Sequence, residues 1–253
     1  MKIAFAKFKR ALKKISRQLR LASKEDIREI NQKLDRIIYC TNCVFRHQAG
    51  LSITDSDFQL ERQIVFRPEE APKSQLTRYM FAKKIVEKND SILDCACGVG
   101  YGSFILAEKV KIVLGVDLSE GSIEWANRFF KRDNNDFKQG DASVFKWPER
   151  FDKIVSFETI EHLEDDKKLI KNFYNHLEDG GTLICSVPNQ NIRPWSRDVN
   201  KYHFRHYTTE DIRNLLETCG FKVVDILYQY PGDKIEKKQG KEGKTIVCIA
   251  KKK

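Results

Sequence analysis

The sequence lacks any long hydrophobic run. None of its apolar stretches approaches the roughly 20 residues that a membrane-spanning helix requires. The basic beginning of the chain also lacks the apolar core of a signal peptide, because its longest apolar stretch is Ala4-Phe5-Ala6. Membrane insertion and secretion are therefore disfavoured, and we expect a cytoplasmic protein.

Cysteines in disulfide or metal-binding patterns are scarce as well. The seven cysteines are an odd number in a chain without a secretory signal, which disfavours a disulfide framework. Cys40 and Cys43 form a CxxC pair, but the sequence has no second pair and no histidine at zinc-finger spacing. We therefore interpret the two as ordinary reduced thiols, with a zinc site as the alternative.

Negative charge is scarce near both ends of the chain. The net charge of +10 divides into +8 for residues 1–38, +5 for residues 232–253 and −3 for the body between them. A nucleic-acid-binding domain normally carries its basic surface on the folded body. The distribution therefore disfavours nucleic acid and indicates basic extensions that meet a membrane or an acidic partner.

No acidic residue precedes Glu25, and the residues before it have the pattern of an amphipathic helix. Spacings of three and four place five apolar residues on one helix face: Phe5, Phe8, Leu12, Ile15 and Leu19. Eight Lys and Arg residues flank this stripe, which favours a helix over 1–22 lying in an anionic membrane interface, with peripheral contact to the inner face of the membrane. The alternative is a helix that packs on the protein itself or on a partner. A second helix is expected from Ser23 to about Ile38.

The rest of the chain predicts one large domain after a linker. We assign residues 1–45 to the helical extension, 46–73 to a linker or lid with weak periodicity, and 74–253 to the domain. Within the domain, short apolar strands alternate with amphipathic helices, which predicts an α/β fold: a Rossmann-like, doubly wound, mostly parallel seven-stranded sheet. The pattern indicates strands over 91–95, 111–116, 151–157, 182–187, 221–228 and 245–249, and helices over 74–88, 102–109, 120–132, 165–177 and 209–219.

Ligands of such sheets bind outside the carboxyl ends of the strands, so the strand ends are the places to search. The first strand leads into the glycine-rich segment LDCACGVGYG at 93–102. Its glycines permit a tight turn and a close approach of the backbone to a ligand at a helix N-terminus. Asp94 precedes the glycines and Asp117 ends the next strand, where a carboxylate can accept both ribose hydroxyls of an adenosine ligand.

This pattern resembles the class I S-adenosylmethionine-dependent methyltransferases, whose first motif is Asp-x-Gly-x-Gly-x-Gly. Residues 94–100, DCACGVG, match it except that Ala96 replaces the first glycine. Five further features occur in the family's order: Asp117, the 140–142 segment, the start of the fourth strand at 151–155, the 180–181 glycine pair and the Cys-Gly-Phe at 219–221. The resemblance implies S-adenosylmethionine as cofactor, bound by Asp94, Ala96, Gly98, Gly100, Asp117, Asp141, Ala142 and Phe157.

A nicotinamide-dependent dehydrogenase is the rival interpretation of the glycine-rich segment. That class prefers GxGxxG, whereas Gly98, Gly100 and Gly102 have GxGxG spacing. It also gives no role to Asp94 or to the 140–141 pair. A non-catalytic methyltransferase-like module that binds a partner through its basic ends is a third alternative.

The segment FETIEHL at 157–163 follows the fourth predicted strand. A helical turn there would place Glu158, Glu161 and His162 on one face, where they can bind a divalent cation or act as general base. The alternative is a loop of solvated carboxylates. The motif resembles Glu-x-x-Glu-His of ubiquinone-biosynthesis O-methyltransferases and small-RNA 2′-O-methyltransferases, which implies a Mg²⁺ or Mn²⁺ site formed by Glu158, Glu161, His162 and His203. We assign the catalytic role to Glu161, His162 and His203.

Residues 186–212 carry aromatic, basic and histidine side chains beside the expected cofactor site. Tyr and Trp rings can stack on a sugar or quinone, and Arg can hold a phosphate or carboxylate; the alternative is a packed surface loop. Pro188-Asn189 and the His-x-x-x-Tyr-Thr element at 203–208 resemble glycan- and lipopolysaccharide-associated methyltransferases. We therefore expect O-methylation of a sugar hydroxyl in a glycan or lipid-linked saccharide, with a quinone-type phenol or an RNA 2′-hydroxyl as alternatives.

Overall fold

A computed structural model of the chain describes residues 65–198 and 200–253. The chain divides into two compact units, residues 1–56 and 57–253, and the description concerns the second. The predicted helices over 1–22 and 23–38, the Cys40–Cys43 pair and most of the linker lie outside the described residues. The predicted boundaries of the three segments stay predictions.

Helices and strands alternate through most of the described part. The helices are α4 (Lys73–Ile85), α5 (Tyr101–Ala107), α6 (Glu120–Phe129), α7 (Asp166–His176) and α8 (Thr209–Thr218), with short 3-10 turns η1 (Pro68–Glu70) and η2 (Ile160–His162). The strands are β1 (Ser91–Cys95), β2 (Ile112–Asp117), β3 (Asn135–Gln139), β4 (Phe151–Phe157), β5 (Leu177–Pro188), β6 (Phe221–Tyr230), β7 (Lys234–Glu236) and β8 (Thr245–Lys252).

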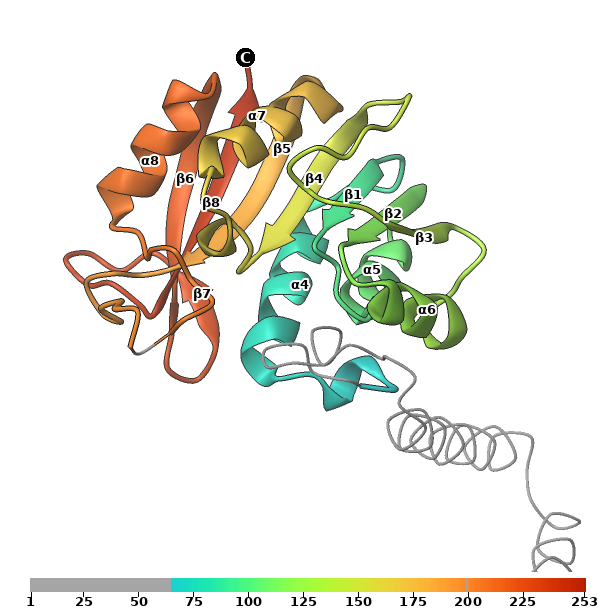
Figure 1. The fold of residues 1–253 in the computed structure, drawn as a ribbon, viewed down its shortest axis with the longest axis horizontal. Helices are drawn as coiled ribbons and strands as arrows, with labels where there is room; N and C mark the ends of the chain where they lie inside the picture. The colour runs from blue at the N-terminus through green and yellow to red at the C-terminus, as the bar shows by residue number, and fades with distance from the viewer. Residues whose placement is uncertain (1–64, 199) are drawn as a thin grey trace, which may run out of the picture. The chain divides into compact units, whose positions relative to one another are not determined.

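The strands form one sheet in the order β3-β2-β1-β4-β5-β8-β6-β7 (Figure 1). Strands β1 to β5 pair in parallel, whereas β8 is antiparallel to both β5 and β6. After β1 the chain builds outward through β2 and β3, and then returns to the other side of β1 with β4. The order therefore reverses between β1 and β4, which is where a ligand crevice is expected in a doubly wound sheet.

The predicted α/β fold is confirmed, and the sheet has eight strands among the described residues where seven were expected. The additional strand is β7, which pairs with β6 at the edge of the sheet. It has three residues and a single apolar one, Ile235, so the sequence offers no alternation to detect. Strand β3 was not among the strands located from the sequence, because its sequence NDFKQ is mostly polar.

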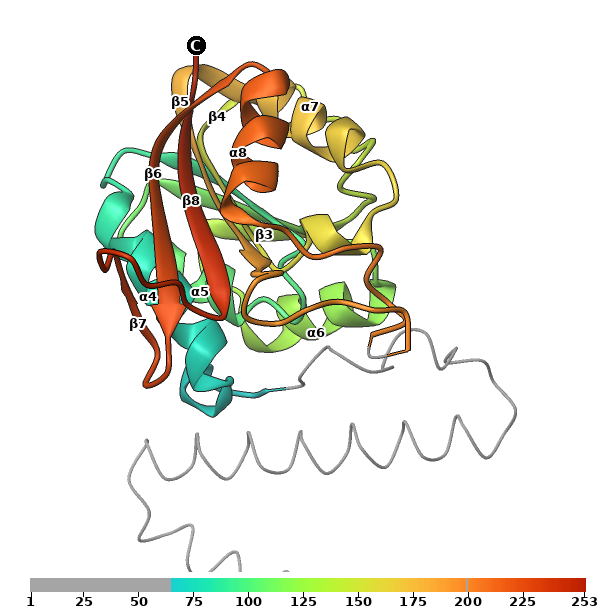
Figure 2. The same cartoon turned by 90° about the vertical axis from the view of Figure 1, so that its left-hand side faces the viewer.

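Helices cover both faces of the sheet. Helices α7 and α8 contact each other on one side of β6 and β8, and α4 lies on the other side (Figure 2). Buried apolar side chains from β1, β4, β5 and β8 fill the space beneath α7 and α8. A continuous core of this kind holds the strand ends at fixed positions.

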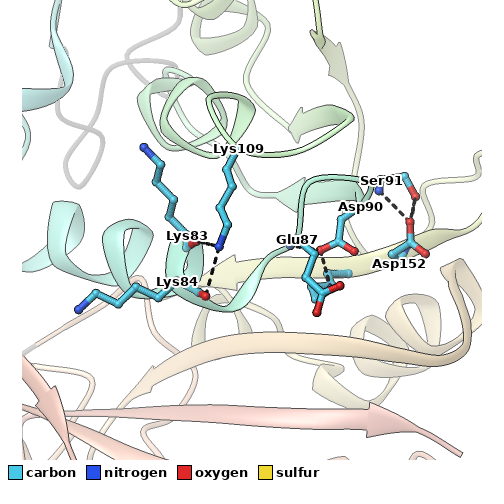
Figure 3. Close-up of polar contacts among 8 residues, drawn as sticks. Lys83, Lys84, Glu87, Asp90, Ser91, Lys109 and Asp152 are labelled. Carbon is cyan, nitrogen blue, oxygen red and sulfur yellow. Dashed lines mark hydrogen bonds and ion pairs between the residues drawn. The ribbon is translucent and has the colours of Figure 1, made fainter.

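Separate polar contacts lie at the C-terminal end of helix α4 and at the start of strand β1 (Figure 3). The ammonium group of Lys109 donates to the carbonyl oxygens of Lys83 and Lys84, at 2.9 and 3.3 Å, which satisfies carbonyls that the last helical turn leaves open. The Asp152 carboxylate accepts from both N and Oγ of Ser91 at 2.8 Å, so β4 is tied to the start of β1. These contacts tie the end of α4 to the segment after α5, and β1 to β4.

The residues just before α4 are also packed. The indole Nε1 of Trp125 donates to the carbonyl oxygen of Val65 at 2.9 Å, and the ring of Phe66 lies edge-on to Trp125 with centroids 4.6 Å apart. Both Val65 and Phe66 are buried.

None of the described helices has the length and apolar character that a membrane span requires.

Candidate functional site

A cavity of about 520 Å³ lies at the carboxyl ends of the parallel strands. Its wall includes Ala96 and Gly98 from the turn after β1, Asp117 at the end of β2 and Phe157 at the end of β4. The cavity therefore occupies the crevice that the strand order predicts. Asp141 and Ala142, which follow β3, also line it.

The glycine-rich turn depends on unusual backbone angles. Ala96, Gly98 and Gly100 have φ values of 61°, 55° and 90°, all in the left-handed region. Gly100 begins α5, and a Cβ there would lie 2.6 Å from Cβ of Ala126 and 2.8 Å from the ring of Phe137. Glycine is thus required at 100 for packing as well as for conformation, whereas Ala96 tolerates the left-handed angle at some conformational cost.

The carboxylate of Asp117 is held in a fixed orientation. One oxygen accepts from the backbone N–H of Gly98 at 2.8 Å and the other from that of Ser119 at 2.9 Å. The side chain is buried, and it lines the cavity.

Asp94 is fully buried beneath the cavity and does not form its wall. Its carboxyl group accepts from Tyr79 Oη at 3.1 Å and from Ser103 Oγ at 2.6 Å. Burial raises the pKa of Asp94 from 3.8 to about 7, although the two hydrogen bonds oppose the change. Tyr79 does line the cavity, so Asp94 is connected to the cavity wall through that tyrosine.

Six of the eight residues predicted to bind the cofactor therefore line one cavity. The two that do not, Asp94 and Gly100, support its floor and its glycine-rich turn. The sequence reasoning missed the contribution of α4, from which Gln75, Arg78 and Tyr79 also line the cavity. Their spacing of i, i+3 and i+4 places these polar side chains on one helix face, and this was the signal available.

The predicted Glu-x-x-Glu-His segment forms the opposite wall. Glu158 has a left-handed φ of 50°, and its Oε1 accepts from Ser186 Oγ at 2.9 Å. Glu158 and His162 line the cavity, whereas Glu161 is fully buried behind it. Ligand atoms of Glu161, His162 and His203 all lie within 4.8 Å of one another. The structure thus brings together three of the four predicted metal ligands, and Glu158 is not part of that group.

The hydrogen bonds of the histidines define their tautomers. His206 Nδ1 lies 2.6 Å from the carbonyl oxygen of Arg193, which can only accept, so Nδ1 is the donor. In the neutral His206 ring, Nε2 then accepts the hydrogen bond from His203 Nδ1 at 2.7 Å. Burial lowers the pKa of His206, in keeping with a neutral ring. His162 Nδ1 faces the carbonyl oxygen of Tyr202 at 3.2 Å and also donates. In the neutral form of His162 and His203, this arrangement places the lone pair of each ring on Nε2.

This donor set fits two kinds of chemistry. Two imidazole lone pairs and a carboxylate at this separation can hold a divalent ion, and the nitrogen content favours manganese or zinc over magnesium. Without an ion, a neutral His162 at the wall of the cavity can act as a general base through Nε2. In both cases the reactive group adjoins the cavity that contains the glycine-rich turn.

Comparison with known proteins gives consistent matches. The methyltransferase domain family matches residues 66–226. A probable S-adenosylmethionine-dependent methyltransferase of Mycolicibacterium smegmatis is 29% identical over 159 residues, 62% of this chain and 61% of that protein. Phosphoethanolamine N-methyltransferase 1 of Triticum aestivum is 30% identical, covering 55% of this chain and 30% of the plant protein. The chain thus spans at most about 60% of the length of these relatives.

Solved structures show the same fold at low sequence identity. An S-adenosylmethionine-dependent methyltransferase from Clostridium acetobutylicum superposes with a TM-score of 0.56 and 20% identity, covering 73% of this chain and 93% of that one. The N-methyltransferase NodS of Bradyrhizobium japonicum, solved with S-adenosyl-L-homocysteine, gives a TM-score of 0.57 and 17% identity, covering 73% and 89%.

Proposed function

The chain belongs to the methyltransferase domain family, and from this premise we propose that it transfers the methyl group of S-adenosylmethionine to an acceptor hydroxyl. The observation that carries the proposal is the shared cavity. Asp117 and the glycine-rich turn form one wall, and Glu158 and His162 form another, so a cofactor and a proton acceptor would meet in one space.

The residues present fit S-adenosylmethionine. The volume of about 520 Å³ is in the usual range for a cofactor site. The carboxylate of Asp117 supports ribose binding, and Asp141, which lines the same cavity, would accept the adenine amino group. The cofactor supplies an electrophilic methyl carbon on a sulfonium sulfur.

The chain's own residues would then align the acceptor and remove its proton. Methyl transfer is an in-line displacement, so the acceptor oxygen must be held opposite the sulfur. His162 takes up the hydroxyl proton at Nε2, because its Nδ1–H is retained by the carbonyl oxygen of Tyr202. Glu161 and His203, behind His162, would hold a divalent ion if one is used, and such an ion lowers the pKa of a bound hydroxyl.

We further propose a sugar hydroxyl of a glycan or lipid-linked saccharide as the acceptor. Support comes from the segment after β5, in which Tyr202 lines the cavity with 38% of its surface exposed, a position suited to stacking on a sugar ring. The quinone-type phenol remains the alternative within the hydroxyl class. The named phosphoethanolamine N-methyltransferases favour a second candidate, a small amine acceptor.

The first test is calorimetric titration of the full chain with S-adenosylhomocysteine, followed by transfer of labelled methyl groups to saccharide, phenol and amine acceptors. Binding in the micromolar range and labelling of a hydroxyl compound are expected. Labelling of phosphoethanolamine alone would replace the hydroxyl proposal by the amine one. If the chain binds no S-adenosylhomocysteine at high micromolar concentration, it is a non-catalytic module.

The metal is tested separately. If Glu161, His162 and His203 hold an ion, exhaustive chelation abolishes turnover and manganese or magnesium restores it, and Glu161→Gln removes the response. Full turnover after chelation would leave His162 as a base that works without metal. Ser143→Ala, elsewhere on the cavity wall, is the matched control and keeps the wild-type response to chelation.

A further inference from the structure

Arg78 is a buried cation in the wall of the cavity. It lies on the face of α4 toward the sheet, and only 5% of its surface is exposed. Its Nη1 donates to Gln229 Oε1 at 2.8 Å, and its Nε has no hydrogen-bond partner among the described residues. A guanidinium has five N–H donors, so most of its capacity is unused here.

The described part of the chain supplies no carboxylate within ion-pairing distance of Arg78. Asp94 is the buried acid on the adjoining strand, but the groups that govern its pKa, besides burial, are Ser103, Tyr79 and Asp117. A buried charge without a counter-charge costs several kcal/mol. A purely structural link between α4 and β6 would be made at lower cost by a neutral side chain.

Gln229 holds the guanidinium in its position. Its Oε1 accepts from Arg78, and its Nε2 donates to the carbonyl oxygen of Ser74 at 2.9 Å, in the first turn of α4. Gln229 is itself buried, with 4% of its surface exposed, near the end of β6. The amide thus orients the cation from the far half of the sheet without neutralising it.

From this arrangement we infer that Arg78 is a receptor for an anionic group, a carboxylate or phosphate, of a ligand bound in the cavity, and that Gln229 is its positioning residue. A guanidinium binds such groups through two parallel hydrogen bonds. Two ligands can supply the anion: the amino-acid carboxylate of the cofactor, which rests on the proposed function, or an acidic group of the acceptor.

The test compares S-adenosylhomocysteine with its decarboxylated analogue by calorimetry on the full chain. The wild type is expected to bind the carboxylated ligand roughly 10- to 100-fold more tightly, as a charge-assisted hydrogen bond implies. Arg78→Met should abolish this preference, because it weakens the binding of S-adenosylhomocysteine and not that of the analogue. Arg78→Lys should retain part of the preference. Arg213→Met, on the exposed face of α8, is the matched control and should keep the full preference.

Gln229→Leu should reduce the preference for the carboxylate while leaving the decarboxylated analogue bound as before. Gln229→Glu should also reduce the preference, because the new carboxylate would form an ion pair with the Arg78 guanidinium at the site of the 2.8 Å contact. If Gln229 had only a structural role, its substitution would weaken the binding of both ligands equally. Thermal melting of each variant shows whether the fold is retained.

A second arm identifies the source of the anion. Acetate and inorganic phosphate are titrated into the chain saturated with S-adenosylhomocysteine. An unchanged ligand preference in Arg78→Met, combined with loss of acetate or phosphate binding, assigns the site to the acceptor. If Arg78→Met alters neither measurement, the inference is wrong. Should the wild type bind no S-adenosylhomocysteine, the proposed function fails, and the acetate and phosphate titrations of the unliganded chain still test Arg78.

Discussion

At the scale of single residues, Asp94 makes stability depend on pH. Its pKa is raised from 3.8 to about 7 in the folded chain, chiefly by burial, so between these values the folded state binds more protons than the unfolded state. Stability from this group is therefore full below about pH 4 and declines as pH rises to 7. At about 1.4 kcal/mol per pKa unit, the loss is at most about 4 kcal/mol.

Urea unfolding of the wild type and Asp94→Asn between pH 5 and 8 measures this effect. The wild type should lose stability relative to the variant as pH rises, because asparagine does not titrate. Asp133→Asn, at an exposed aspartate, should follow the wild-type curve. Parallel curves for the wild type and Asp94→Asn would show that Asp94 titrates normally.

Asp117 determines cofactor affinity at the same scale. Removing a charge-assisted acceptor of two ribose hydroxyls should weaken S-adenosylhomocysteine binding by about 1.5–3 kcal/mol in Asp117→Ala. Loss of the bonds from Gly98 and Ser119 also loosens the turn, so melting must confirm the fold. Asp136→Ala on β3 is the control, and equal affinities for both variants would contradict the assignment.

At the scale of elements, α4 and α5 are packed through Gly102. A Cβ at this position would lie 2.0 Å from Cζ of Tyr79, deep inside van der Waals contact. Gly102→Ala should therefore displace Tyr79 from Asp94 and destabilise the fold by about 1–3 kcal/mol in urea unfolding. In a Tyr79→Leu background the added methyl group should cost less, and an equal cost would show that another contact is responsible.

The same elements show what the sequence could and could not predict. Strands β1 and β4 lie over the predicted residues, because each is a short apolar run bounded by turn or polar residues. Strand β5 starts at Leu177 instead of 182, since it pairs with β4 from Phe151 onward through a polar stretch. Strand-end residues such as Asp117 were found because their function follows from position in the sheet. Arg78 was not found, because tertiary packing on α5, β4 and β7 brings α4 to the cavity.

At the scale of the whole molecule, the uneven charge leads to a prediction about residues 1–22, which lie outside the described residues. They hold eight cations, each contributing up to about 1 kcal/mol near an anionic surface. The full chain should co-sediment with anionic vesicles, and a chain starting at Ser23 should not. High salt should weaken binding, because the Debye length falls from about 10 Å at 0.1 M to about 3 Å at 1 M. Neutral vesicles are the control, and equal partitioning of both chains would identify the stripe as a packing face.

The place of β8 has a consequence for how the protein is made. It is the last strand along the chain, yet it lies inside the sheet, between β5 and β6. During synthesis β5 and β6 emerge from the ribosome before the strand that joins them, and both keep an open edge until residues 245–252 arrive. The parallel half around the glycine-rich turn can form earlier. A nascent chain stalled before β8 would therefore be the form most in need of a chaperone.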